Sequence, residues 1–505
     1  MKLRALVLAL TVTALFPIHS VAAEVTSKSQ QTAPGVFIDT SIYLPKKTPA
    51  PAILLAHGFG GSKDSVVTEA QAFQKRGYVV MTWTARGFGK STGQISMNSL
   101  SAEITDVQQL ITTLGKRKDV LQDRTGDPVV GIAGGSYGGA AALLTASQDK
   151  RIDAVVADIT WNDLSQALFP QSSSDLAEAG PFKKIWTGTF FALATLQSAY
   201  LGECGALTNE WCSAYKSAVM NGQPSAAERK LLRSVSPVSF LSSIKAPTLL
   251  SQGQADSLFP LNESSQTAAV LKKNGVPLSM IWHAAGHDGG ADEKKYLQEQ
   301  YSRWFDKHLL KQEIDFPLFQ FTKTNGSISL QDSTAIPKSF TATRLPFEAE
   351  MKKLPLLAQP AAMSYPVGGI PSAISSLPGI GSAGSLAATV ASSFAGFSPA
   401  FVPGQSGFLD SAVLQEPISV TGSSRIKVRV TSTTGEATLF FSLVTKSPSG
   451  AISQPNGIVA PIRLTNIPAE GRDITVTLPA VILDAAIGDT VAIGISSTDQ
   501  GYELP

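Results

Sequence analysis

The sequence predicts an α/β protein with a helical insertion, followed by a separate all-β domain. Short apolar runs of the buried-strand type alternate with helix-forming segments through the first half of the chain, which is typical of α/β domains. The alternation stops between residues 161 and 242, where the segments are helical and rich in aromatic residues. Beyond residue 411, strand-like runs separated by Gly, Ser and Pro turns indicate a β-sandwich.

The chain of 505 residues is too long for one compact core, so more than one domain is expected. The changes in sequence pattern divide it into four regions. We expect a signal peptide at 1–23, an α/β domain at 24–312, a connecting low-complexity region at 313–410 and the β-sandwich at 411–505. The helical insertion at about 161–242 would form a cap over the carboxyl ends of the strands, where open α/β sheets bind ligands. The connecting region has no charged residue from Leu354 to Leu409, and we interpret it as a loop or linker rather than an apolar surface for lipid or substrate.

The first 23 residues have the form of a secretory signal. Lys2 and Arg4 precede an apolar run at 5–16, and small residues at 21–23 form a cleavage site. The apolar run is too short to span a bilayer, and no later run is long and apolar enough to do so. We therefore expect an exported protein, secreted or periplasmic. Its mature charge is near neutral and does not suggest nucleic acid as a partner.

The two cysteines, Cys204 and Cys212, are expected to form a disulfide, because an exported protein meets an oxidising environment. On one continuous helix they would lie about 12 Å apart, whereas a bridge needs Cα atoms within about 7 Å. Gly205 and Asn209 lie between them and can supply the turn that a bridge requires. Two free buried thiols are the alternative.

The strongest functional signal is a strand–turn–helix at the centre of the α/β half. The apolar run at 128–133 predicts a buried strand, which ends in Gly-Gly-Ser-Tyr-Gly at 134–138 and is followed by an Ala/Leu-rich helix. This is the pattern of the nucleophile elbow, with Ser136 as the nucleophile. Gly134 and Gly138 allow the strand and the helix to approach closely. A glycine-rich connection with an incidental serine is the alternative.

A second glycine-rich loop follows the apolar strand at 52–56. Its sequence is His-Gly-Phe-Gly-Gly, and in this architecture such a loop supplies a backbone N–H to the oxyanion hole. The candidate donors are the N–H groups of Phe59 and Tyr137. We interpret His57 as structural rather than catalytic.

The acid and the base follow in the order nucleophile, acid, histidine that is typical of α/β-hydrolases. Asp256 follows a strand end, and His287 lies in a loop flanked by glycines that can place it over Ser136. The alternatives are Asp158, late in the preceding strand, and His283, at a strand end. The remaining histidines lie in the signal peptide, the oxyanion loop and the closing helix: His19, His57 and His308.

No cofactor or metal is expected. The Gly-Phe-Gly-Lys run at 87–90 lacks the spacing of a phosphate loop or a dinucleotide fingerprint. Two cysteines at the spacing of Cys204 and Cys212 also make a poor zinc site. Between these segments, residues 101–114 form an amphipathic pattern that predicts a helix with Ser101 as its N-cap.

Three features together resemble the X-prolyl dipeptidyl-peptidase/cocaine-esterase family: the elbow at 134–138, the Arg-Gly-Phe-Gly-Lys-Ser-Thr-Gly stretch at 86–93 and the β-rich tail. The resemblance implies an α/β-hydrolase domain with a helical cap joined to a C-terminal jelly roll, over most of the mature chain. The chain departs from the family at Thr84, where aspartate is usual. It departs again at 57–59, where His-Gly-Phe replaces a tyrosine-bearing oxyanion loop. Both departures weaken the expectation of dipeptidyl-peptidase specificity.

We therefore expect an exported serine hydrolase that cleaves carboxylic ester or amide bonds through an acyl-enzyme on Ser136. Its substrate would be a small-molecule ester or peptide. The aromatic cap favours an apolar acyl or alkyl group, and its few acids form no close pair that would hold a substrate ammonium group. An X-Pro dipeptidyl-peptidase and a catalytically silent binding protein are the alternatives.

Overall fold

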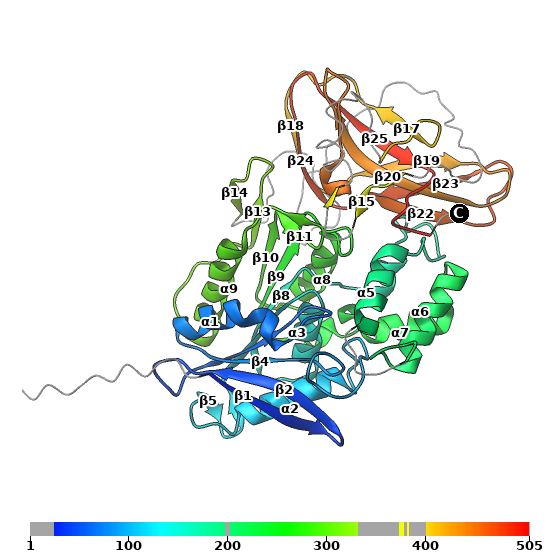
Figure 1. The fold of residues 1–505 in the computed structure, drawn as a ribbon. Coiled ribbons are helices and arrows are strands. Elements are labelled where there is room, and N and C mark those ends of the chain that lie inside the picture. Colours follow the sequence, from blue (N-terminus) through cyan, green and yellow to red (C-terminus); the bar gives the residue numbers. More distant parts are fainter. Residues whose placement is uncertain (1–24, 197–201, 332–372, 378–380, 383–399, 504–505) are drawn as a thin grey trace, which may run out of the picture.

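The computed structural model describes residues 25–196, 202–331, 373–377, 381–382 and 400–503 (Figure 1). The expected signal peptide and most of the uncharged segment at 354–409 lie outside these residues. The α/β domain carries a group of helices on one side, and a β-rich domain lies above both (Figure 1). None of the helices in the described part of the chain has the length and hydrophobicity needed to cross a bilayer.

A ten-stranded sheet forms the centre of the α/β domain, in the order β1-β2-β4-β3-β7-β8-β9-β10-β13-β14. Its inner strands are parallel and rich in buried apolar residues, as expected for a sheet covered on both faces. The strands are β1 (Val25–Ala33), β2 (Val36–Tyr43), β3 (Ala52–Ala56), β4 (Val79–Trp83), β7 (Val130–Gly135), β8 (Ile152–Asp158), β9 (Thr248–Gly253), β10 (Leu278–His283), β13 (Phe319–Thr322) and β14 (Ile328–Gln331). Two short hairpins accompany it: β5 (Gln122–Arg124) with β6 (Asp127–Pro128), and β11 (Ala285–Gly286) with β12 (Gly289–Gly290).

Helices cover both faces of this sheet. Buried residues of α1 and α9 pack together against one face, and those of α2, α3 and α8 pack against the other. The bounds are α1 (Val67–Arg76), α2 (Glu103–Leu114), α3 (Tyr137–Gln148), α8 (Asn262–Lys273) and α9 (Lys294–Leu309), with a short 3-10 helix η1 (Lys63–Val66) before α1.

The segment expected to form the cap, at about 161–242, lies between β8 and β9 in the sequence and is helical. It consists of α4 (Leu164–Leu168), α5 (Lys184–Leu196), α6 (Asn209–Asn221), α7 (Ala226–Ser234) and the 3-10 turns η2 (Pro237–Ser239) and η3 (Leu241–Ser243). The structure joins Cys204 and Cys212 in a disulfide, with the Cα atoms 5.5 Å apart. Gly205, with φ at 52°, makes the turn that separates Cys204 from α6.

The β-rich domain is antiparallel and has its own apolar core. Its strands are β17 (Ser406–Asp410), β18 (Ile418–Gly422), β19 (Arg425–Val430), β20 (Ala437–Lys446), β21 (Ile452–Ser453), β22 (Ala460–Leu464), β23 (Arg472–Thr477), β24 (Val481–Ala485) and β25 (Thr490–Ser496), with a 3-10 turn η4 (Pro455–Gly457). A small hairpin, β15 (Ser376–Leu377) and β16 (Gly381–Ser382), precedes them.

Backbone hydrogen bonds attach the β-rich domain to the cap. The N–H of Ser172 donates to the carbonyl of Pro461 over 3.0 Å, and the N–H of Thr477 donates to the carbonyl of Ser172 over 2.8 Å. The carboxylate of Asp175 accepts from the N–H of Thr475 over 2.7 Å. The cap is therefore held between the two larger domains.

Both ends of the connecting region expected at 313–410 shift. The α/β domain continues past residue 312, because β13 pairs in parallel with β10 and β14 pairs with β13. The buried rings of Phe319 and Phe321 give β13 its place in the sheet. The β-rich domain begins before residue 411, because β17 pairs with β25.

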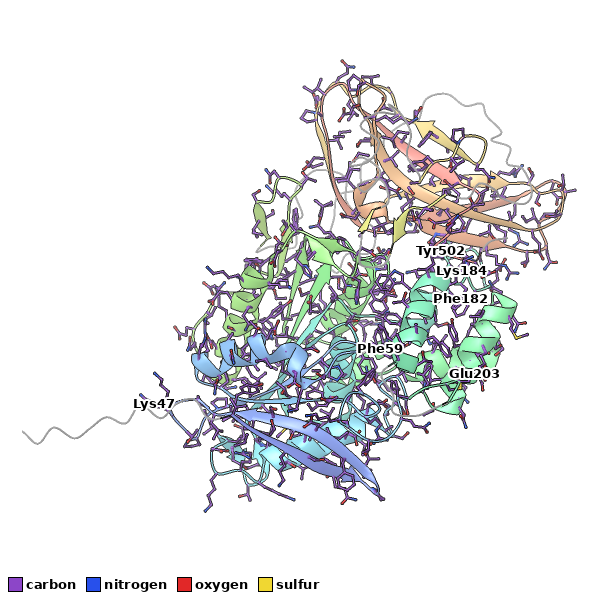
Figure 2. The ribbon with its side chains drawn as sticks, in the orientation of Figure 1. Lys47, Phe59, Phe182, Lys184, Glu203 and Tyr502 are labelled. Carbon is purple, nitrogen blue, oxygen red and sulfur yellow. A yellow bond between two sulfur atoms is a disulfide. The ribbon has the colours of Figure 1, made fainter. Side chains whose placement is uncertain are left out.

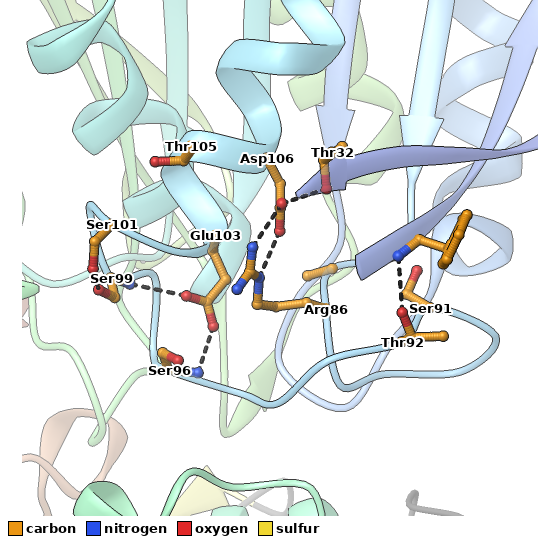
Figure 3. Close-up of polar contacts among 12 residues, drawn as sticks. Thr32, Arg86, Ser91, Thr92, Ser96, Ser99, Ser101, Glu103, Thr105 and Asp106 are labelled. Atoms are coloured by element: carbon orange, nitrogen blue, oxygen red, sulfur yellow. Dashed lines mark hydrogen bonds and ion pairs between the residues drawn. The ribbon is translucent and has the colours of Figure 1, made fainter. Parts of the chain in front are cut away.

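One strand was not predicted, and one local prediction is wrong. The polar segment before Val36 forms an edge strand, β1, whose side chains are mostly exposed and show no apolar pattern. Ser101 is not the N-cap of α2, because the helix begins two residues later, after Ala102. The carboxylate of Glu103 binds the backbone N–H groups of Ser96 and Ser99 instead, over 2.5 and 3.1 Å (Figure 3).

Candidate active site

Ser136 lies in a tight turn between β7 and α3. Its φ of 56° and ψ of −119° place a non-glycine residue in a strained backbone conformation, which raises its side chain above the end of the sheet. A Cβ atom on Gly134 would lie 2.5 Å from the carbonyl carbon of Gly138. A Cβ atom on Gly138 would lie 2.8 Å from the carbonyl oxygen of Ala56, so the positions two before and two after the serine both need glycine.

The structure brings Ser136, His287 and Asp256 into one hydrogen-bonded chain. His287 Nε2 lies 2.8 Å from Ser136 Oγ, and His287 Nδ1 lies 2.7 Å from Asp256 Oδ2. Asp256 is completely buried, and its other oxygen accepts the N–H of Phe259 over 2.7 Å. With the Nδ1 proton held by Asp256, Nε2 is left to accept the Ser136 proton, as a catalytic triad requires.

The surroundings of His287 favour its protonated form. Burial lowers its pKa, but the charge and hydrogen bond of Asp256, together with the charges of Asp288 and Asp158, raise the pKa above the ordinary value of 6.5. A protonated imidazole cannot accept the serine proton. The arrangement can therefore act as a base only above that raised pKa.

The two alternative residues pair with each other instead. His283 Nε2 lies 3.1 Å from Asp158 Oδ1, and His283 is buried at the end of β10. The backbone carbonyl of Asp158 accepts the N–H of Ser136 over 2.9 Å, so this pair lies at the base of the elbow. Among the hydrogen bonds of the described residues, the Ser136 hydroxyl is reached by His287 and not by His283.

The second glycine-rich loop passes beside the nucleophile. A Cβ on Gly58 would lie 3.9 Å from the Cβ of Ser136, and the rings of Phe59 and Tyr137 meet edge to face at 5.5 Å. The loop and the start of α3 thus lie together above β3 and β7. Their N–H groups are the candidate oxyanion donors.

His57 holds this loop, as predicted. Its Nε2 accepts the N–H of Ala85 over 2.9 Å, and its Nδ1 lies 2.7 Å from the carbonyl of Gly58. Burial lowers the pKa of His57 to about 4, so the ring is neutral at physiological pH.

A buried polar network beneath the elbow was not predicted from the sequence. Asn98 donates to the carbonyl of Tyr137 over 2.8 Å, and the Tyr137 hydroxyl lies 3.4 Å from Glu103. Burial raises the pKa of Glu103 to about 7. Arg86 forms a two-pronged ion pair with Asp106, both bonds 2.7 Å long, beside this network (Figure 3). The stretch at 86–93 also contacts the elbow directly, because the rings of Phe88 and Tyr137 meet edge to face at 5.7 Å.

An apolar pocket of about 80 Å³ lies between Phe59 and the cap. Figure 2 places Phe59 between the α/β domain and the cap helices, and its ring meets that of Phe190 at 5.3 Å. Trp186 of α5 contacts the His287 ring edge to face at 5.8 Å, so the cap reaches the triad. Apart from Met97, which precedes α2, the remaining lining residues come from the cap: Leu164, Leu168, Phe169, Phe182, Thr187, Phe191, Leu207, Trp211, Ala214, Tyr215, Ala218, Pro224, Glu228 and Leu232.

Solved structures with similar folds cover nearly the whole chain. An aminopeptidase from the marine sediment archaeon Thaumarchaeota archaeon gives a TM-score of 0.62 at 13% identity, over 98% of this chain and 93% of that one. A CocE/NonD family hydrolase from Staphylococcus aureus gives 0.60 at 14% identity, over 97% and 91%. An α-amino acid ester hydrolase gives 0.62 at 14% identity, over 98% and 94%. At these identities the likeness shows a common fold.

Curated relatives match a shorter segment. An uncharacterised 31.7 kDa protein of Escherichia coli is 29% identical over 114 residues, which are 22% of this chain and 38% of that protein. The quorum-quenching protein AidA of Acinetobacter baumannii is 30% identical over 131 residues, 25% of this chain and 41% of that protein. The chain thus spans about two fifths of the length of these relatives.

Family profiles match both halves of the chain. Residues 404–505 match the X-Pro dipeptidyl-peptidase C-terminal non-catalytic domain. Residues 34–289, just over half of the chain, match the X-Pro dipeptidyl-peptidase (S15 family). These matches confirm the resemblance and the fold class predicted from the sequence. With a serine turn, a hydrogen-bonded histidine and aspartate, and both domains of the family in place, the chain belongs to the S15 family of serine α/β-hydrolases.

Proposed function

We propose that this protein is an exported serine hydrolase that cleaves carboxylic esters with an apolar acyl or alkyl group. The observation that carries the proposal is the chain of hydrogen bonds from Ser136 through His287 to Asp256, next to an apolar pocket. Family membership supports the reaction class, and the lining of the pocket supports the choice of substrate.

In the proposed reaction each of these groups has one role. His287 Nε2 takes the proton of Ser136 as Oγ attacks the ester carbonyl, and the negative oxygen is held by the N–H groups of Phe59 and Tyr137. His287 then returns that proton to the leaving alcohol, which leaves an acyl group on Ser136. A water molecule, deprotonated by His287, attacks the acyl carbonyl and releases the acid and the free enzyme.

The pocket favours an ester over an X-Pro dipeptide. A dipeptidyl-peptidase must hold a free α-ammonium, which needs a carboxylate within the pocket. Among the described lining residues Glu228 is the one carboxylate, and it accepts the N–H of Ser225 over 2.6 Å at the start of α7. The aromatic lining stabilises a buried apolar group by about 25 cal/mol per Å².

Export is supported by the sequence of residues 1–23 and is consistent with the disulfide in the cap. Fractionation of the producing cells, with N-terminal sequencing of the mature protein, tests this part. Export predicts a chain that begins after Ala23 and lies outside the cytoplasm; a cytoplasmic chain that begins at Met1 contradicts it.

Purified protein is to be assayed against p-nitrophenyl esters of graded chain length and against X-Pro-anilides. We expect kcat/KM for the best ester to exceed that for the best X-Pro-anilide by at least about tenfold, or roughly 1.4 kcal/mol of transition-state discrimination. Equal or faster release from an X-Pro-anilide would establish the peptidase alternative. No turnover in either panel would favour a silent binding protein.

A further inference from the structure

Lys183 is a buried cation at the point where the cap meets the loop after Asp256. It lies directly before α5 and is 3% exposed. Its Nζ donates to the backbone carbonyls of Ser257 and Leu258, over 2.6 and 2.8 Å. These are the two residues that follow Asp256 in the chain. A lysine of the cap therefore binds the loop that carries the acid of the triad.

The same loop is held at two further points. Trp186 Nε1 donates to Ser257 Oγ over 3.0 Å, and the N–H of Ser257 donates to Asp288 Oδ2 over 2.5 Å. Asp288 is the neighbour of His287, and Trp186 contacts the His287 ring. The acid and the histidine of the triad are thus fixed to each other through Ser257, and both are fixed to α5.

Lys183 also supplies positive charge to a region rich in buried acids. Burial lowers its pKa to about 8, while Glu263 of α8, Asp256 and Asp288 favour its charged form. Asp256, Asp288 and Asp158 in turn raise the pKa of His287. Loss of the ammonium group would remove a buried positive charge that acts on Asp256 and Asp288, so His287 would hold its proton to higher pH.

The backbone around Lys183 is anchored to the β-rich domain. The N–H of Glu503 donates to the carbonyl of Phe182 over 2.8 Å, and the N–H of Ile185 donates to the carbonyl of Gly501 over 3.4 Å. Figure 2 shows Phe182, Lys184 and Tyr502 together where the cap meets that domain. The position of Lys183 therefore depends on the docking of all three parts of the molecule.

We propose that Lys183 is a positioning residue that ties the cap to the Asp256 loop, so that the substrate pocket and the triad are held as one unit. The proposal rests on the proposed function, in which Asp256 orients His287. If Lys183 only fills space, its charge and its two hydrogen bonds will not matter to the reaction. The two cases differ in loop exchange and in the pH profile.

The test compares Lys183→Met and Lys183→Arg with Lys184→Met, which changes the neighbouring, half-buried lysine. Arginine has room to be accommodated, because Lys183 borders a cavity of about 400 Å³. Hydrogen–deuterium exchange of a peptide spanning 254–260 reports the order of the loop without requiring activity. The pH profile of kcat/KM on a p-nitrophenyl ester reports the histidine.

We expect Lys183→Met to speed exchange in this peptide at least fivefold. It should lower kcat at least tenfold with KM changed less than threefold, and it should move the acid limb of the profile to higher pH. Lys183→Arg should restore most of kcat, and Lys184→Met should match the wild type within twofold. If Lys183→Met leaves either the exchange or the kinetics unchanged, Lys183 is not a positioning residue.

A second comparison decides the question if Lys183→Met does not fold. The lysine loses its charge above about pH 8, whereas an arginine keeps it. The wild type should therefore lose kcat above that pH, and Lys183→Arg should keep it to a pH at least one higher. Identical alkaline limbs would overturn the proposal. If the wild type hydrolyses no ester, the proposed function fails, and exchange of the 254–260 peptide, corrected for the intrinsic exchange rate and measured on either side of pH 8, then decides the inference by itself. Faster corrected exchange above that pH in the wild type but not in Lys183→Arg supports it, and identical behaviour of the two proteins overturns it.

Discussion

Two histidine–aspartate pairs lie within the same group of strand ends, and their surroundings differ. His287 sits on the turn between β11 and β12, and its Nε2 reaches Ser136 Oγ at 2.8 Å. His283 ends β10 and bonds Asp158, whose carbonyl holds the N–H of Ser136. A loop can carry an imidazole over the nucleophile, whereas a strand end keeps it in the sheet. A histidine and an aspartate therefore complete the triad in one pair, whereas in the other pair they hold the turn that carries Ser136.

The largest expected effect separates the two histidines. His287→Ala removes the group that takes the Ser136 proton, so kcat should fall by about 10⁴-fold or more. His283→Ala leaves the proton path intact and should keep kcat within about tenfold of the wild type. Both variants are to be compared by the burst of p-nitrophenol release, with Tm measured as a control for folding. Equal loss in the two variants would mean that the assignment of the base is wrong.

Substitution of the two aspartates should also lower kcat by different amounts, with a smaller difference than for the two histidines. Asp256→Asn keeps the shape but disturbs the tautomer of His287, which costs about 10³- to 10⁴-fold in kcat in triads of this kind. Asp158→Asn should cost less than about tenfold, because Asp158 holds Ser136 through its backbone carbonyl. Steady-state kcat on one ester measures both variants. A greater loss in Asp158→Asn would make Asp158 the acid.

The acid limb of the pH profile sharpens the comparison further. Because the pKa of His287 is raised, kcat/KM should rise with pH through a midpoint above 6.5. Asp288 contributes to that raised value, and its own pKa is raised to about 6, first by burial and then by the charge of Asp256. Asp288→Asn removes a negative charge and should move the midpoint to lower pH by about 0.5. A midpoint unchanged or higher in this variant would contradict the electrostatic account.

The smallest expected effect concerns the disulfide of the cap. The disulfide between Cys204 and Cys212 closes a short loop, which stabilises the folded chain by about 2 to 3 kcal/mol in the loop-entropy account. The double variant Cys204→Ser/Cys212→Ser should lower Tm by a few degrees and change kcat by less than about threefold. Intact mass should show two hydrogens fewer than in the reduced protein. Two alkylatable thiols without reductant would reject the bridge.

The features that the sequence predicted are those with a local signature. The apolar run before Ser136, the glycines around it and the glycine-flanked loop of His287 mark strand, turn and loop by neighbouring residues alone. The bonds of Lys183 to Ser257 and of Asn98 to Tyr137 join side chains to distant backbone carbonyls, and no spacing rule marks them. The strand β1 escaped notice for a related reason, since exposed edge strands lack an apolar pattern.

The central claim is that Ser136 becomes covalently modified through the action of His287. The most direct measurement is fluorophosphonate labelling of the wild type, His287→Ala and His283→Ala, with the modified peptide identified by mass spectrometry. One phosphonyl group should appear on Ser136 in the wild type and in His283→Ala, and labelling of His287→Ala should be slower by orders of magnitude. Absence of labelling in the wild type, or labelling at another serine, would contradict the account.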